Sequence, residues 1–296
     1  LTNFIGDPVD MLVPENATLE QIESARARLG LDKPLPVQYG IFIRDVLHGN
    51  FGKSYIYGKP AMDRIFERIP ATLELVAVAA CLVLCIAIPL GVYAGAYPKR
   101  ASSKLIMSGS ILGISLPSFW VGMMMIYIFA VVLRLLPASG RGNTVMVGKV
   151  ALSIFAPGGI RYVILPAITL ALTNVATMLR LTRSGILENM RQDYIKFARA
   201  KGVPAKSILF GHALKNALIP VVTIFGMDLG NMIAFTTITE TIFAWPGMGK
   251  LLIDAINKSD RPIIVAYLMA AACMFVVLNF IVDILYTLID PRIELR

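Results

Sequence analysis

Polar side chains inside an apolar stretch are the residues of this sequence best placed for chemistry. Asp228 is the single charge in the stretch 216–239, and Asn231 and Thr239 fall on the same face at about 100° per residue. A charge in the middle of a bilayer costs about 2.5–3.5 kcal/mol on insertion scales, so it requires water or a partner. This face is therefore expected either to line a pathway that attracts a cationic solute group or to hold a hydrogen bond inside a helix bundle.

Two further patterns suggest enzyme chemistry, and both are incomplete. Asp228 and Asp283 could belong to an intramembrane aspartyl protease, but Asp228 follows Gly226-Met227 and not a Gly-x-Gly context. Gly247-Met-Gly-Lys250 is similar to the end of a phosphate-binding loop, but Leu251 stands where Ser or Thr would contact magnesium. Neither an HExxH nor a GxSxG motif is present. We therefore expect no catalytic group, no metal site and no nucleotide hydrolysis in this chain.

The most informative motif is a short basic segment at residues 192–202. Asp193 is a good N-cap residue, and Gly202 followed by Pro204 is typical of a helix end. These signals predict a helix over residues 194–201, roughly 12 Å long at about 1.5 Å per residue. The helix lies between two long apolar stretches, so it is either a solvated connector or an element that another protein grips.

The elements that must position these residues lie in a membrane. The 296-residue chain is 56% hydrophobic and only 16% charged, where soluble domains average about 25% charged residues. Its three cysteines give no disulfide framework or metal site and are expected to be small buried residues. Five stretches are adequate to cross about 30 Å of hydrocarbon, with their prolines as tolerated kinks: residues 75–98, 105–133, 162–179, 216–239 and 262–282.

Small residues at four-residue spacing predict close packing between these helices. They form three ridges, at Gly226/Gly230/Ala234, Ala87/Gly91/Gly95 and Gly109/Gly113.

Basic residues set the expected orientation. The net charge of +9 lies mostly beside the apolar stretches, which the positive-inside rule explains without nucleic-acid binding. The basic loops 98–104 and 184–215 are assigned to the cytoplasm, and residues 1–72 and 241–261 to the outside. Five spans with residues 1–72 outside lead us to expect a further membrane helix before Leu1.

The chain thus divides into an extracytoplasmic helical segment, residues 1–72, and a transmembrane domain, residues 73–296. In the first part, Thr18-Leu-Glu-Gln21 is a capping box that opens a helix ending at Gly30. Residues 34–49 predict a second helix, and residues 60–70 predict a third that ends near Pro70.

The basic segment also carries a family resemblance. Residues 193–202 and 212–220 are similar to the "EAA" loop of permease subunits in ABC importers, in its peptide-transporter branch. Lys196 and Phe197 stand where the general motif has Glu and Ala. Other segments follow in the order expected of the dipeptide/oligopeptide B-type permease: residues 6–8, 29–34, 49–52, 70–75, 115–120, 245–249 and 290–293.

The resemblance implies an all-α, polytopic permease of the type I ABC importer fold in the bacterial cytoplasmic (inner) membrane. It implies a homologous second permease, two ATPase subunits that bind ATP and magnesium, and an extracytoplasmic solute-binding protein as partners. This chain would hold no cofactor. Residues 194–201 would be the coupling helix, in which Tyr194, Phe197 and Ala198 dock into a groove on the ATPase. Lys201 and Gly202 complete the expected ATPase-coupling set, Gly202 through its backbone freedom at the helix end.

A self-contained secondary transporter is the main alternative. It would be expected to carry paired broken helices or an internal repeat, and the sequence shows neither. Which solute is carried does not follow from the resemblance, since the branch takes dipeptides, oligopeptides, glutathione, nickel chelates and opines.

Overall fold

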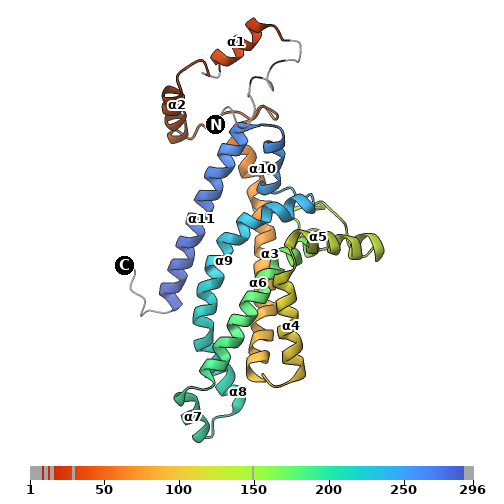
Figure 1. The fold of residues 1–296 in the computed structure, drawn as a ribbon, viewed down its shortest axis with the longest axis vertical. Helices are drawn as coiled ribbons and strands as arrows, with labels where there is room; N and C mark the ends of the chain where they lie inside the picture. The colour runs from red at the N-terminus through yellow and green to blue at the C-terminus, as the bar shows by residue number, and fades with distance from the viewer. Residues whose placement is uncertain (1–8, 10–12, 14–16, 29–30, 149, 290–296) are drawn as a thin grey trace.

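Long helices that run side by side form most of the structure, a computed structural model that describes residues 9, 13, 17–28, 31–148 and 150–289 (Figure 1). The long helices α3, α6 and α9 share one apolar core, with α11 packed against α9 and α3 and with α4 packed against α6 and α3. The elements are α1 (Leu19–Arg28), α2 (Leu35–Leu47), α3 (Ala61–Ala96), α4 (Ala101–Ser115), α5 (Ser118–Met125), η2 (Ile126–Val132), β1 (Val145–Val147), β2 (Val150–Leu152), α6 (Ile160–Asn189), α7 (Asp193–Ala200), α8 (Ala205–Ser207), η3 (Ile208–Ala213), α9 (Leu214–Ile242), α10 (Met248–Asn257) and α11 (Arg261–Ile289).

Four helices within the described residues are long and apolar enough to cross a membrane: Ala61–Ala96, Ile160–Asn189, Ala205–Ile242 and Arg261–Val282. The stretch 105–133, expected as one span with Pro117 as a tolerated kink, is instead broken into α4 and the α5–η2 pair, which are bent by 104°. The bend falls at Leu116 and Pro117, both in extended conformation. A residue before proline is pushed out of the helical region, which explains why the span breaks here.

The two ends of the helices differ in what they carry. The loop between α3 and α4 lies at the same end as α7 and α8, whereas α1, α2 and α10 lie at the opposite end (Figure 1). Both basic loops of the sequence, 98–104 and 184–215, therefore share one end. The common position of the two loops was expected, and the side of the membrane on which this end lies stays a prediction.

The prediction of a separate helix over residues 60–70 was wrong. α3 runs without a break from Ala61 to Ala96 and includes Pro70 and Pro89, so residue 72 lies inside a helix. Ala71 and Leu75, just beyond Pro70, are buried in the shared core. That tertiary packing holds the helix together across a residue that would end it in a soluble segment.

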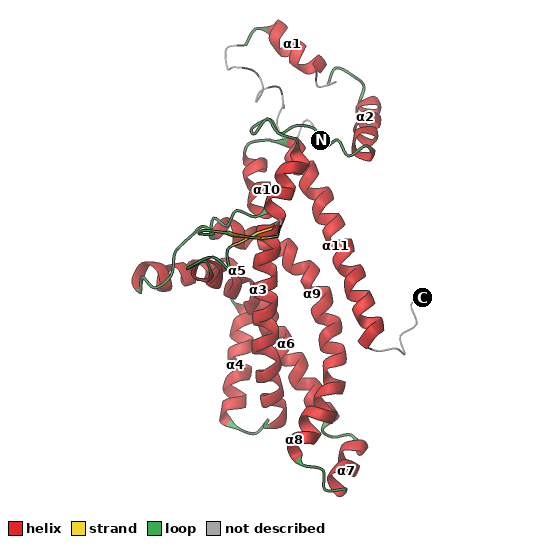
Figure 2. Ribbon diagram, turned by 180° about the vertical axis from the view of Figure 1, so that it is seen from behind, coloured by secondary structure: helices red, strands yellow, loops and turns green. Residues whose placement is uncertain are grey.

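The first capping box was predicted correctly. The Thr18 backbone N–H donates to Gln21 Oε1 at 3.1 Å, and the Gln21 N–H donates to Thr18 Oγ1 at 3.4 Å. The second helix is α2, while Gly30 lies outside the described residues. Figure 2 shows one addition to the helical fold, a hairpin of β1 and β2 beside α3, in which Val147 pairs with Val150.

Glycines set the closest helix contacts. A Cβ at Gly91 would lie 2.8 Å from the Leu179 carbonyl oxygen, and one at Gly95 would lie 2.7 Å from Ile186 Cβ, so both positions require glycine where α3 meets α6. Gly226 and Gly230 pack against Val282 and Phe275 of α11. The predicted ridges are confirmed at these positions.

Two packing predictions were wrong. Gly109 faces open space, with nothing within 4 Å of a Cβ built there. The three cysteines, Cys81, Cys85 and Cys273, are exposed on α3 and α11 rather than buried. Their faces point away from the core that α3, α6 and α9 share, so they are open to lipid or to another subunit.

Candidate functional site

The helix α7 begins after Gln192 and ends in a glycine cap. Its N-cap is Gln192, so the prediction of Asp193 as N-cap was wrong by one residue. Asp193 is the first helical residue, where its carboxylate faces the positive helix end and pairs with Lys196 at 2.8 Å. At the other end Gly202 has φ +76, and Val203 N–H donates to the Ala198 carbonyl oxygen at 3.1 Å. This Schellman arrangement confirms Gly202 as the helix stop.

An apolar anchor holds α7 against the spans, and sequence reasoning missed it. Ile195 is fully buried and belongs to one apolar cluster with Ile186 of α6, Ala217 of α9, Val92 of α3 and residues of η3. The signal was available, because Ile195 is the single branched aliphatic residue within α7. α7 is therefore joined to the ends of three long helices.

The predicted coupling residues divide between this anchor and the surface. Phe197 is 60% exposed and Tyr194 is 40% exposed, and Lys201 Nζ lies 4.5 Å above the Phe197 ring. Ala198 is half-buried and packs against the anchor cluster. The structure thus brings Tyr194, Phe197 and Lys201 to the outer surface of α7. Ala198 lies between this surface and the buried cluster of Ile195.

The polar residues of α9 do not share one environment. Asp228 is half-buried and Asn231, one turn further on, is exposed. Thr239 is buried at the far end of the helix, so it does not belong to the same surface. Gly226 and Gly230 face α11, which leaves Asp228 and Asn231 on the other side of α9.

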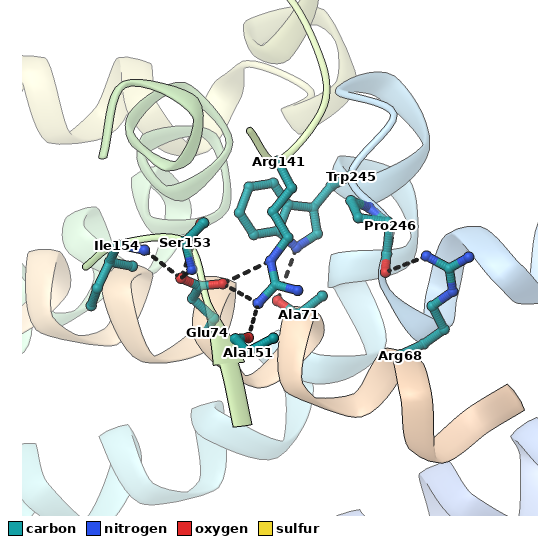
Figure 3. A network of polar contacts seen from close by, with 9 residues as sticks. All are labelled: Arg68, Ala71, Glu74, Arg141, Ala151, Ser153, Ile154, Trp245 and Pro246. Atoms are coloured by element: carbon teal, nitrogen blue, oxygen red, sulfur yellow. Dashed lines mark hydrogen bonds and ion pairs between the residues drawn. The ribbon is translucent and has the colours of Figure 1, made fainter. Parts of the chain in front are cut away.

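Far from α7, a buried ion pair joins the segment 137–159 to α3 (Figure 3). Arg141 Nη2 lies 2.5 Å from Glu74 Oε2, and the other Glu74 oxygen accepts N–H bonds from Ser153 (2.6 Å) and Ile154 (2.7 Å). Arg141 also donates to the Ala151 carbonyl oxygen at 2.6 Å and lies over the Trp245 ring. A buried carboxylate with this set of donors is a structural group.

A second buried carboxylate, Glu240 of α9, organises the loop 243–247. Thr72 Oγ1 donates to Glu240 Oε1 at 2.6 Å and accepts the Met248 N–H at 2.9 Å, while Lys250 N–H donates to Glu240 Oε2 at 3.0 Å. Trp245 Nε1 donates to the Ala71 carbonyl oxygen at 2.9 Å, and Arg68 reaches the Pro246 carbonyl oxygen (Figure 3). α3, α9 and α10 are therefore tied together here.

This arrangement explains the partial phosphate-loop pattern at Gly247–Lys250. At the start of α10 the Lys250 backbone N–H does meet an acidic group, but that group is the carboxyl of Glu240. A Cβ at Gly247 would collide with the same carboxylate, so the first glycine of the pattern serves this contact. Among the described residues no group of three or more His, Cys, Asp or Glu side chains could hold a metal ion.

Known proteins of one kind are similar to this chain over nearly its whole length. Residues 87–295 match the family described as "Binding-protein-dependent transport system inner membrane component", and residues 3–76 match the corresponding N-terminal family. The chain is 38% identical over 301 residues to the "Probable D,D-dipeptide transport system permease protein DdpB" of Escherichia coli, covering 97% of this chain and 88% of that protein. It is also 38% identical over 290 residues to the "Oligopeptide transport system permease protein AppB" of Bacillus subtilis, covering 98% and 90%.

Among solved structures, an inward-facing form of the MetNI methionine ABC transporter is similar, with a TM-score of 0.60. The match covers 77% of this chain and 97% of that one at 15% sequence identity, so it concerns the fold alone.

Proposed function

The chain belongs to the family of inner membrane components of binding-protein-dependent transport systems, and from this membership we propose how it works. It is a multi-pass permease subunit of an ABC importer, a transport subunit and not an enzyme. We propose that it lies in a bacterial cytoplasmic membrane and pairs there with a homologous second permease. Two ATPase subunits drive the pair, and an extracytoplasmic binding protein delivers the solute.

The observation that carries this proposal is α7 itself. A capped helix of 8 residues lies beyond the ends of the spans, fixed below by Ile195 and presenting Phe197 and Lys201 above. An exposed aromatic ring on a rigid basic helix is suited to a groove on a partner. ATP and magnesium are bound by the ATPase subunits in this proposal, and motion of those subunits reaches the spans through α7.

The solute proposed for this transporter is a dipeptide or short oligopeptide. The names of both relatives support this class, since one is a D,D-dipeptide permease and the other an oligopeptide permease. The binding protein would set which peptide is delivered, so this chain would select only broadly.

The test is purification of the tagged chain after co-expression with its neighbouring genes. A second permease and two ATPases should co-purify, and the reconstituted complex with binding protein should take up labelled dialanine or trialanine only when ATP is present. Peptide uptake by this chain without ATPases, driven by an ion gradient, would instead establish the secondary-transporter alternative.

Asp228 and Asn231 are the proposed pathway residues. They lie on the side of α9 away from α11, one half-buried and one exposed, and a carboxylate there can attract the ammonium group of a peptide. Asp228→Asn keeps the shape and removes the charge, so uptake should fall while the ATPases still co-purify. Glu188→Gln, an exposed carboxylate of α6 near the cytoplasmic end, is the matched control. Loss of assembly in Asp228→Asn would show a structural role in place of a pathway role.

A further inference from the structure

The hydroxyl group of Tyr194 lies between the ends of two membrane helices. Tyr194 Oη donates to Asn189 Oδ1 at 2.7 Å, at the last residue of α6. The same oxygen accepts a hydrogen bond from Asn216 Nδ2 at 2.9 Å, near the start of α9. The hydroxyl thus uses both its donor and its acceptor capacity inside the chain.

This bridge continues into the contact between the two helices. Asn189 Nδ2 donates to the Gly185 carbonyl oxygen at 2.8 Å, which directs its Oδ1 toward Tyr194. At Gly185 the helices touch, because a Cβ there would lie 3.0 Å from Ala217 Cβ of α9. The hydrogen-bonded chain therefore starts on α9, passes through α7 and ends where α6 crosses α9.

Two kinds of contact hold α7, and they constrain it differently. The apolar contacts of Ile195 hold α7 against the spans but are non-directional, so they permit rotation and sliding. The hydrogen bonds of Tyr194 have preferred distances and angles, so they fix the orientation of α7 relative to both helices at once.

We propose that Tyr194 is a positioning residue whose hydroxyl makes α7, the end of α6 and the start of α9 move as one body when an ATPase displaces α7. The proposal rests on the function proposed above and assigns the Tyr194 hydroxyl an internal role, distinct from contact with the ATPase. Its removal should leave ATP hydrolysis intact and reduce the movement that hydrolysis produces.

The first test measures that rigid connection without any solute. In the assembled complex with Cys81, Cys85 and Cys273 replaced by serine, spin labels at Arg199→Cys and Lys215→Cys report the distance from α7 to the start of α9. The distance should be the same without nucleotide and with a non-hydrolysable ATP analogue, and Tyr194→Phe should broaden it or make it change between the two states. A distance that changes in the parent protein, or an unchanged narrow distance in Tyr194→Phe, would overturn the proposal.

The second test measures coupling, with a matched control in the chain. Tyr93 Oη bonds Ser102 Oγ at 2.9 Å and accepts a bond from Arg100, so its hydroxyl joins α3 to the start of α4 at the same end of the molecule. In proteoliposomes supplied with binding protein and labelled dialanine, Tyr194→Phe should lower uptake per ATP hydrolysed by about three- to tenfold, the range that loss of one or two neutral hydrogen bonds implies. Tyr93→Phe should not, and an equal loss in both would contradict the proposal.

A partner substitution keeps the proposal testable if Tyr194→Phe fails to assemble. Asn216→Leu leaves Tyr194 in place and should give the same loss, and the double variant should lose no more than either single one. Additive losses would show that the two residues act separately. If the parent complex shows no ATP-driven uptake, the proposed function is wrong. If the parent complex takes up peptide and every variant takes up as much, only the proposed role of Tyr194 is wrong.

Discussion

At the residue scale, the attachment of the hairpin segment to α3 depends on one buried charge pair. The side chains of Glu74 and Arg141 are only 1% and 11% exposed, and Glu74 also accepts two backbone N–H groups of the loop after β2. Desolvation makes such a pair a weak source of stability by itself. Removal of one partner is costly, however, because it leaves the other charge buried and uncompensated.

We predict that Arg141→Met lowers the stability of the purified protein by about 3–5 kcal/mol. Arg141→Met combined with Glu74→Leu should recover part of this loss, although the Ser153 and Ile154 N–H groups then lack their acceptor. Thermal unfolding in detergent measures both variants. A double variant less stable than Arg141→Met alone would show that Glu74 acts mainly through the loop and not through the pair.

At the element scale, the packing of α3 on α6 sets the shape of the bundle. Gly91 and Gly95 stand on one face of α3, each in contact with α6 at distances that exclude a methyl group. Gly109, on α4, belongs to a ridge of the same spacing but faces open space. The four-residue spacing identified all three glycines, and only the structure shows which of them pack against another helix.

We predict that Gly91→Ala and Gly95→Ala destabilise the protein by about 1–3 kcal/mol through overpacking. Gly109→Ala should be neutral or stabilising by up to about 1 kcal/mol, since alanine favours a helix more than glycine does. Unfolding by SDS titration compares the three variants. A stable Gly91→Ala protein would show that α3 and α6 can separate without loss of the fold.

The element α7 allows anchor and surface to be tested apart. Ile195→Ala should cost about 2–5 kcal/mol locally and expose the amide groups of α7 to hydrogen exchange, because a fully buried side chain is lost. Phe197→Ala should leave exchange unchanged, since the ring is exposed, and should weaken recovery of the ATPases in purification. If Phe197→Ala raised the exchange and Ile195→Ala instead weakened recovery of the ATPases, our assignment of the anchor and the docking surface would be wrong.

At the scale of the whole molecule, the arrangement of charges predicts which end faces the cytoplasm. With the three native cysteines replaced by serine, an impermeant maleimide added to intact cells should label Lys258→Cys, at the end of α10, and leave Lys201→Cys unlabelled. Both positions are exposed in this chain, and expression without the ATPase subunits keeps Lys201 uncovered, so access then depends on the side of the membrane. Labelling of Lys201→Cys only would invert the orientation.

At this scale, some features of the fold could be predicted from the sequence and others could not. Hydropathy and capping signals act locally, so they predicted the long helices, the Thr18 capping box and the end of α7 at Gly202. The contacts of Glu74 with Arg141 and of Glu240 with Thr72 join residues far apart in the chain, and no local pattern encodes such pairings. The continuation of α3 through Pro70 likewise depends on burial against other helices.

The bend between α4 and α5 has a consequence for the surrounding lipid. α4 has 15 residues, about 22 Å of helix at about 1.5 Å per residue, while a typical hydrocarbon layer is about 30 Å thick. Lipid beside α4 therefore meets an apolar helix shorter than the hydrocarbon layer, a hydrophobic mismatch that local thinning of the bilayer or cover by another subunit relieves. The acyl-chain length of the surrounding lipid should then affect the stability of the bend between α4 and α5, and short-chain lipids should favour the bent form.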